Sequence, residues 1–189
     1  MPLRPALALP GTGNRHLASH ISLLICYQTS NISGATDMNQ QLADLARRHL
    51  IAENEQDMEG TLATLHPECR FDDLATGQTW LGREAAAAHY RQWWTTFDVE
   101  VKRGPGQVSA WTADDVCMAE ATWHGRHIGR FLGIEPTGRT IVQPFVVVLS
   151  FREGLMVSER FHYDLGALVR QIGGPALPAL DELPYRKAA

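Results

Sequence analysis

The chain has 189 residues, of which 44% are hydrophobic and 20% charged, which predicts one globular domain with some additional length. Its net charge of −4 provides no basic surface for a phosphate backbone, so nucleic acid is not an expected partner. No apolar run reaches the roughly 18 residues of a membrane span, and the three widely spaced cysteines indicate neither a disulfide framework nor a zinc site. A reducing cytoplasm fits this cysteine pattern best.

Residues 1–37 differ from the rest of the chain and are predicted to form a flexible extension. They are rich in Pro, Gly, Ser, Thr and Asn and lack sustained hydrophobic periodicity. An export signal, a glycosylation sequon at 31–33 and a start at Met38 are alternative interpretations of this segment. The rest of the chain divides into a domain over 38–174 and a tail over 175–189.

Three helices are predicted in the N-terminal half. Apolar residues recur at helical spacing over 38–55, and His49 lies on the buried stripe. A second, short helix ends at His66-Pro67, because the residue before a proline avoids helical geometry. A third helix over 83–97 carries a broad aromatic face that includes Trp94 and could grip a flat ring.

The clearest strand signal is a hairpin over 141–163. Odd positions of its first strand are apolar except for Gln143, and the chain reverses at Gly154, which can adopt the positive φ of a tight turn. The odd positions of the return strand are expected to share one face: Val157, Glu159, Phe161 and Tyr163. An inward carboxylate at Glu159 would be costly without a partner.

Further strands and a closing helix complete the predicted fold. The strands are expected over 69–73, 98–103, 107–111 and 116–124, followed by an extended, glycine-rich arm over 125–139. Helices segregated from mainly antiparallel strands are typical of an α+β fold. We expect a cone-shaped, curved sheet packed on three N-terminal helices, with a cavity between the two layers.

The segment GRHIGRFLGIEPTGR, the hairpin and YDLGALVRQIG together resemble the SnoaL-like polyketide cyclases of the nuclear transport factor 2-like superfamily, which includes the ketosteroid isomerases. The resemblance covers residues 42–173 and carries HxGxFxG, PTGR and Dx6QxG in this order. It implies a cofactor-free α+β barrel, usually a homodimer, whose cavity holds a hydrophobic oxygenated small molecule. It also implies an aldol cyclisation that uses an aspartate as acid and base.

The matching positions depart from both groups of relatives. The acid/base aspartate of the aldol cyclases falls at Phe161, and a glutamine and a histidine of their pocket fall at Phe145 and Val147. In the ketosteroid isomerases the run DMEGTLATLHPECRFDD matches the second helix and strand, and the proton-shuttling base coincides with Asp73. The oxyanion-hole tyrosine of those isomerases falls at His49.

Three residues are candidates for catalysis. Asp73 could move a proton at the mouth of an apolar cavity, or could form the turn that follows it. Asp164, in the Dx6QxG element, could be catalytic or could cap the terminal helix. His49 could polarise a carbonyl or could be a satisfied core residue.

The candidate substrate-binding residues combine polar and apolar side chains: His127, Gln143, Phe145, Val147, Phe161, Tyr163 and Trp94. The polar members could instead satisfy backbone groups around the arm. A metal site formed by His124, His127 and His162 is an alternative without tight ligand spacing.

The leading functional hypothesis is a cofactor-independent enzyme that performs cyclisation or isomerisation by proton transfer on a hydrophobic carbonyl compound. A non-catalytic small-molecule-binding or dimerisation module is the alternative, because Phe145, Val147 and Phe161 replace polar pocket residues. A hydrolase or dehydratase is a third hypothesis, and it requires an activated water held by paired polar groups.

Overall fold

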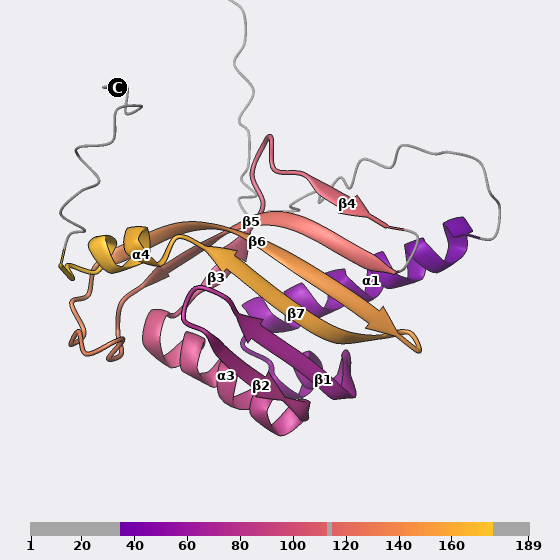
Figure 1. The fold of residues 1–189 in the computed structure, drawn as a ribbon, viewed down its shortest axis with the longest axis horizontal. Helices are drawn as coiled ribbons and strands as arrows, with labels where there is room; N and C mark the ends of the chain where they lie inside the picture. The colour runs from indigo at the N-terminus through magenta and orange to yellow at the C-terminus, as the bar shows by residue number, and fades with distance from the viewer. Residues whose placement is uncertain (1–34, 113–114, 176–189) are drawn as a thin grey trace, which may run out of the picture.

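The computed structural model describes residues 35–112 and 115–175 (Figure 1). The helices are α1 (Ala35–Asn54), α2 (Met58–Ala63), α3 (Gly82–Phe97) and α4 (Leu165–Gln171). The strands are β1 (Leu65–Asp73), β2 (Gln78–Leu81), β3 (Glu100–Lys102), β4 (Ser109–Trp111), β5 (Val116–Arg126), β6 (Thr140–Arg152) and β7 (Leu155–Tyr163). Most of the predicted N-terminal extension, with its possible export signal and sequon, and nearly all of the predicted tail lie outside the described residues.

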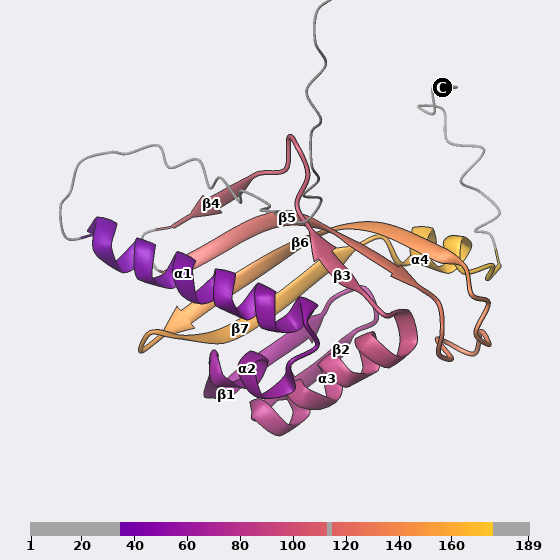
Figure 2. The same ribbon diagram turned by 180° about the vertical axis from the view of Figure 1, so that it is seen from behind.

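One curved sheet organises the domain. Its strand order is β2-β1-β7-β6-β5-β3, with β4 also paired to β5, and every pairing is antiparallel except that of β1 with β7. Figure 2 shows α1, α2 and α3 on one face of this sheet, and α4 packs against β6 at one end. The predicted α+β fold is confirmed, since a sheet with one apolar face needs helices to cover it.

The hairpin of β6 and β7 supplies most of the inner face. All odd positions of β6 from 141 to 151 are buried, as predicted. The turn uses positive φ at both Glu153 (55°) and Gly154 (72°), which matches the twist of the flanking strands. The prediction was wrong at Val157, because a bulge leaves it unpaired and turns Met156 into the core.

Strands β1 and β2 differ most from the prediction. β1 begins at Leu65, four residues earlier than expected, because His66 precedes a proline and adopts the extended geometry of a strand. Leu65 pairs with Met156 of β7 at this new start. The edge strand β2 was not predicted, since its four residues are mostly exposed and carry no apolar alternation.

The arm over 127–139 is seated on the C-terminal end of α3. The amides of Ile128 and Gly129 both donate to the Thr96 carbonyl, at 2.8 and 3.0 Å. A Cβ on Gly129 would lie 2.6 Å from the Thr95 carbonyl oxygen, so this close approach requires glycine. The HxGxFxG element therefore joins the arm to the helix.

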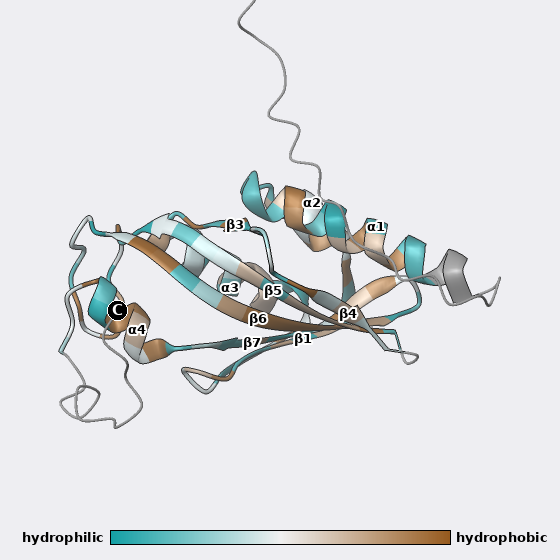
Figure 3. Cartoon of the chain, turned by 90° about the horizontal axis from the view of Figure 1, so that it is seen from above, coloured by the Kyte–Doolittle hydropathy of each residue, from teal (hydrophilic) through white to brown (hydrophobic). Residues whose placement is uncertain are grey.

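The hydropathy of the residues follows the two layers of the fold, the helices and the sheet. Figure 3 shows hydrophilic and hydrophobic residues alternating along α1, which lies over the sheet with its apolar stripe inward. Within the described ranges, no helix is both long and apolar enough to span a membrane.

Candidate active site

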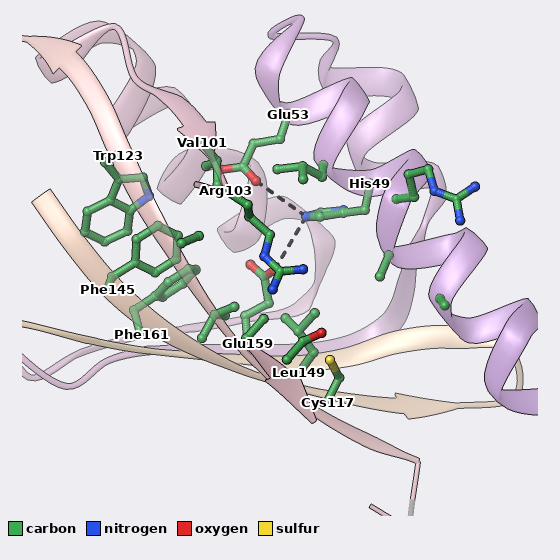
Figure 4. A pocket seen from close by; sticks show the side chains of 18 of the residues that line it. His49, Glu53, Val101, Arg103, Cys117, Trp123, Phe145, Leu149, Glu159 and Phe161 are labelled. Carbon is green, nitrogen blue, oxygen red and sulfur yellow. Dashed lines mark ion pairs between the residues drawn. The ribbon is translucent and has the colours of Figure 1, made fainter. Parts of the chain in front are cut away.

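A cavity of about 110 Å3 lies between α1 and the inner face of the sheet. The helix contributes Ala46, His49, Leu50 and Glu53, and the segment after β3 contributes Arg103. The sheet contributes Cys117, Trp123, Phe145, Val147, Glu159 and Phe161 (Figure 4). The lining is thus apolar except for a few side chains that can carry a charge.

Four of the predicted site residues line this cavity: His49, Phe145, Val147 and Phe161. Phe145 stacks on Trp123, with ring centroids 4.2 Å apart, and the two rings form a flat wall. Trp123 was not predicted, because its position in β5 carries no signal beyond a strand pattern.

Asp73 lies outside the cavity lining, where β1 ends. Its Oδ1 accepts hydrogen bonds from the amides of Ala75 and Thr76, both at 3.0 Å, and its Oδ2 accepts one from the Tyr163 hydroxyl at 2.8 Å. The carboxylate therefore holds the turn before β2 and anchors it to β7. Burial and this neighbouring carboxylate raise the pKa of Tyr163 far above its ordinary value.

Asp164 also lies outside the lining and caps α4. Its Oδ1 accepts a hydrogen bond from the Ala167 amide at 2.8 Å. Gln143 accepts a hydrogen bond from Gln171 at 3.2 Å, which ties α4 to β6. Both hydrogen bonds stabilise the position of α4, and neither involves a residue of the cavity lining.

The remaining predicted binding residues lie outside the cavity lining. His127 accepts a 3.3 Å hydrogen bond from the Thr137 amide at Nδ1, and so stabilises the arm. Trp94 stacks on Tyr90 beside the core, with centroids 5.8 Å apart. The hydroxyl of Tyr163 donates its hydrogen bond to Asp73, as described above.

His49 is held in one tautomer by its helix neighbours. The Thr64 hydroxyl donates to the Thr61 carbonyl at 2.6 Å, so Thr64 Oγ1 is left to accept the proton of His49 Nδ1 at 2.7 Å. Nε2 then carries a lone pair. Burial lowers the pKa of His49 to about 4, so the ring is neutral at physiological pH.

Glu159 is the buried carboxyl opposite this ring. Only 4% of its surface is exposed, and its Oε2 accepts a 3.1 Å hydrogen bond from the Tyr90 hydroxyl. Its Oε1 lies 3.5 Å from His49 Nε2. Burial, and then the nearby charge of Glu53, raise the pKa of Glu159 well above its ordinary value.

Glu53 completes the cluster from one turn further along α1. Its Oε2 lies 4.0 Å from His49 Nε2, and its side chain keeps 19% exposure. Burial raises the pKa of Glu53 to about 7. Glu53 was not predicted, although its i,i+4 spacing from His49 was a usable signal.

Two carboxyl groups and one neutral imidazole thus face a largely apolar space. Such a cluster has more groups that can bind a proton than it has protons. One of its groups can therefore donate a proton to a ligand while another accepts one. Cys117 also lines the cavity, but burial raises its pKa to about 11 and keeps it a thiol, which is a poor nucleophile. Within the described part of the chain no group of three or more His, Cys, Asp or Glu is arranged to hold a metal ion, and His124, His127 and His162 form no such group.

Comparison with known proteins finds one matching family profile and several similar structures. The sequence profile of SnoaL-like polyketide cyclases matches residues 41–172. A candidate SnoaL-like polyketide cyclase from Jannaschia sp. CCS1 superposes with a TM-score of 0.66 at 22% identity, covering 78% of this chain and 99% of that one. TsrD from Streptomyces laurentii gives 0.61 at 28% identity, with 72% and 97% covered.

A third structure shares the fold alone. A hypothetical protein from Catenulispora acidiphila with a ketosteroid isomerase-like fold gives a TM-score of 0.57 at 19% identity, covering 69% of this chain and 93% of that one. No curated protein gives a significant match. Since the profile spans most of the chain and the domain fold agrees, this protein belongs to the SnoaL-like polyketide cyclase family.

Proposed function

We propose that this protein catalyses proton transfer on a hydrophobic carbonyl compound, with Glu159 as the acid and Glu53 as the base. The observation that carries the proposal is the pair of carboxyl groups that line one apolar cavity on either side of a neutral His49. Asp73 and Asp164, which the sequence favoured, have structural contacts that account for both of them.

The two carboxyl groups suit opposite roles. Burial raises the pKa of both groups, and Glu159 is the more deeply buried, with 6% of its side chain exposed against 19% for Glu53, which favours its protonated form. A pKa of about 7 leaves Glu53 roughly half ionised. Catalytic pairs are recognised by environments that push two such pKa values apart.

The reaction then follows a balanced sequence. Glu53 removes a proton from the carbon next to the carbonyl, and the electron pair of that C–H bond forms the C=C bond of an enol. Glu159 donates its proton to the carbonyl oxygen at the same time. The proton returns from Glu53 to Glu159 through His49 or water, and an enol formed in this way can isomerise or attack a second carbonyl of the same molecule.

His49 and Tyr90 position the acid. Tyr90 donates to Oε2 of Glu159 and lies 3.0 Å from Nε2 of His49, so the ring, the phenol and the carboxyl fix one another. Burial keeps both Tyr90 and His49 uncharged, because it raises the pKa of the phenol and lowers that of the imidazole. The acid is therefore held in place without a competing charge.

The test uses the keto–enol interconversion of phenylpyruvate, which has one ring and an acidic C–H bond. We expect the protein to accelerate both this interconversion and exchange of the methylene protons with D2O. Glu159→Gln keeps the shape of the side chain and should reduce the rate by about 10²- to 10⁴-fold, the usual contribution of a positioned acid. Glu55→Gln, on the exposed side just beyond α1, is the matched control and should leave the rate unchanged. A Glu159→Gln variant as active as the wild type would refute the proposal.

A non-catalytic binding role is the second candidate. The stacked Trp123 and Phe145 and the aliphatic lining favour a hydrophobic guest with or without chemistry. The Catenulispora protein was determined with trimethylamine, so a protein of this fold can hold a small molecule. Recovery of a bound compound that stays unchanged during prolonged incubation, together with no catalysis of phenylpyruvate exchange, would support this role.

We also propose a homodimer that forms through the outer face of β5 and β6. This face carries Met118 and Val142, each 48% exposed, and in the described residues no helix covers it (Figure 1). Exposed apolar side chains on an open sheet face suit a second copy of the same face. Sedimentation should show a dimer that Met118→Glu dissociates, and a monomeric wild type would refute this proposal.

A further inference from the structure

Arg103 is a strong cation in the described lining of the cavity, and the proposed chemistry does not use it. It follows β3 directly, lines the cavity and points into it in Figure 4. It also lines an adjoining surface groove, together with Lys102, Thr122 and His124. Arg103 therefore stands between the outside and the carboxyl cluster.

The hydrogen bonds of Arg103 leave its charge unbalanced. Its Nε donates to the Glu120 carbonyl at 3.1 Å and its Nη2 to the Gln107 carbonyl at 3.2 Å. In the described residues it forms no ion pair with a carboxylate, and its Nη1 makes no hydrogen bond. A half-buried guanidinium held only by backbone oxygens is preorganised to bind an anion.

The neighbouring cations differ from Arg103 in this respect. Arg47, which also lines the cavity, pairs with Asp44 at 2.8 Å, and Lys102 pairs with Glu100 at 2.8 Å. Their charges are already balanced on the surface. Arg103 is therefore the cation of this wall that is available to a ligand.

Neutralisation of the internal carboxyl groups does not explain Arg103. A guanidinium that served Glu159 or Glu53 would stabilise the ionised form and lower the pKa of that carboxyl. Both pKa values are instead raised, by burial at each group and, at Glu159, also by the charge of Glu53. The positive charge of Arg103 thus remains free to act on an incoming molecule.

The size of the cavity limits the rest of the ligand. A dry cavity of about 150 Å3 holds one benzene molecule, so a volume of about 110 Å3 that opens to the surface suits one ring or a short chain. A molecule with several fused rings would need the walls to move.

Building on the proposed function, we infer that the substrate is a small anionic carbonyl compound whose acidic group binds Arg103 and whose apolar part enters the cavity towards Glu159. The groove beside Arg103 offers the entry path, because it shares Arg103 with the cavity and its described lining includes no carboxylate side chain. A positive entrance attracts anions and orients them with the acidic group outward. The acidic group would then be bound at the entrance while the carbonyl reaches the acid.

The test compares the binding of phenylpyruvate with that of phenylacetone, in which a methyl group replaces the carboxylate. Calorimetry is performed on the Glu159→Gln protein, so that binding is measured without turnover and independently of the catalytic proposal. We expect phenylpyruvate to bind about 10- to 100-fold more tightly than phenylacetone, the usual contribution of a charge-assisted pair.

Variants at the two arginines locate the effect. Adding Arg103→Gln should remove the preference for phenylpyruvate and leave phenylacetone binding within about two-fold, whereas Arg103→Lys should retain part of the preference. Arg91→Gln, at an exposed position of α3 outside the cavity lining, is the matched control and should change neither affinity. Thermal unfolding shows whether each variant keeps the fold, and the phenylacetone affinity shows whether it keeps the cavity.

Two results would overturn the inference: equal affinity of the parent protein for both compounds, or a preference that survives Arg103→Gln. If the preference is lost with Arg103→Gln but Glu159→Gln retains full activity in the exchange assay, the anion site stands and the catalytic assignment fails. The two proposals can therefore fail separately.

Discussion

Two buried carboxyl groups, Asp73 at the edge of the sheet and Glu159 at its centre, have opposite surroundings. Asp73 is 3% exposed and Glu159 is 4% exposed, so burial alone does not distinguish them. Asp73 receives three hydrogen bonds, two of them from backbone amides. Glu159 receives one, from Tyr90, and otherwise faces the cavity and a neutral imidazole.

The number of donors decides what each group can do. A carboxylate with several donors is stabilised as an anion and serves as a structural anchor. A buried carboxyl with few donors is more stable with its proton and can release that proton to a ligand. A catalytic acid in such a fold is therefore identified by the donors it lacks.

The largest expected effect separates the two regions by activity. Glu53→Gln removes the proposed base and should slow phenylpyruvate exchange at least about 100-fold, whereas Asp73→Asn should change it less than about three-fold. In the wild type the rate should rise with pH through about 7 as Glu53 ionises, and this rise should be absent in Glu53→Gln. If Asp73→Asn loses activity while remaining folded, the catalytic role predicted for Asp73 is correct and the comparison fails.

The second effect separates them by stability. In Asp73→Asn, the side-chain amide faces the three groups that donate to the carboxylate in the wild type: its NH2 cannot accept their hydrogen bonds, and its oxygen accepts them more weakly. The substitution should therefore reduce the free energy of unfolding by about 1–3 kcal/mol. Glu159→Gln retains an acceptor for Tyr90 and should be neutral or stabilising at pH 8. Urea denaturation of the two variants side by side gives both values. A strongly destabilised Glu159→Gln protein would show that the cavity carboxyl is also an anchor.

The third effect is the pH dependence of stability at Glu53. The pKa is about 7 in the folded protein and near 4.5 when unfolded, so the folded state holds the proton more tightly. The stabilisation from Glu53 is therefore complete below pH 4.5 and is lost as pH rises from 4.5 through 7. Glu53→Gln should be about 1–3 kcal/mol more stable than the wild type at pH 8, with no such difference at pH 4. A difference of the same size at both pH values would contradict the shifted pKa.

The smallest effect concerns the other predicted aspartate. Asp164→Ala removes the hydrogen bond to the Ala167 amide at the start of α4 and should cost about 1 kcal/mol of stability. Asp164→Asn can still accept this bond and is the matched control. Activity should be unchanged in both variants. A loss of exchange activity in both would place Asp164 in the mechanism and not only in the cap.

Most of the fold could be predicted because its signals are local. The alternation along β6, the glycine of the 152–154 turn and the helical spacing of α1 each follow from adjacent residues. The bulge at Val157 and the early start of β1 could not be predicted, since both depend on pairing between distant strands. The edge strand β2 carries too little apolar pattern to be detected.

Less of the site could be predicted, because the signals at single positions are ambiguous. His49 was identified from its place on the buried stripe of α1, whereas Glu53 reads as an ordinary polar residue of the same helix. Asp73 attracted attention by its match to the ketosteroid isomerases, yet its donors come from the turn that follows it. The link between Arg103 and the cavity emerges only when β3 is placed beside α1.

The most direct measurement is the infrared spectrum of the protein at neutral pH, in the region of the C=O stretch of a protonated carboxyl group. The account predicts a band in the wild type that persists in Asp73→Asn and loses its main component in Glu159→Gln. If the wild type shows no protonated carboxyl at neutral pH, or if the spectrum is unaltered in Glu159→Gln, then Glu159 does not hold the proton that the proposed reaction requires.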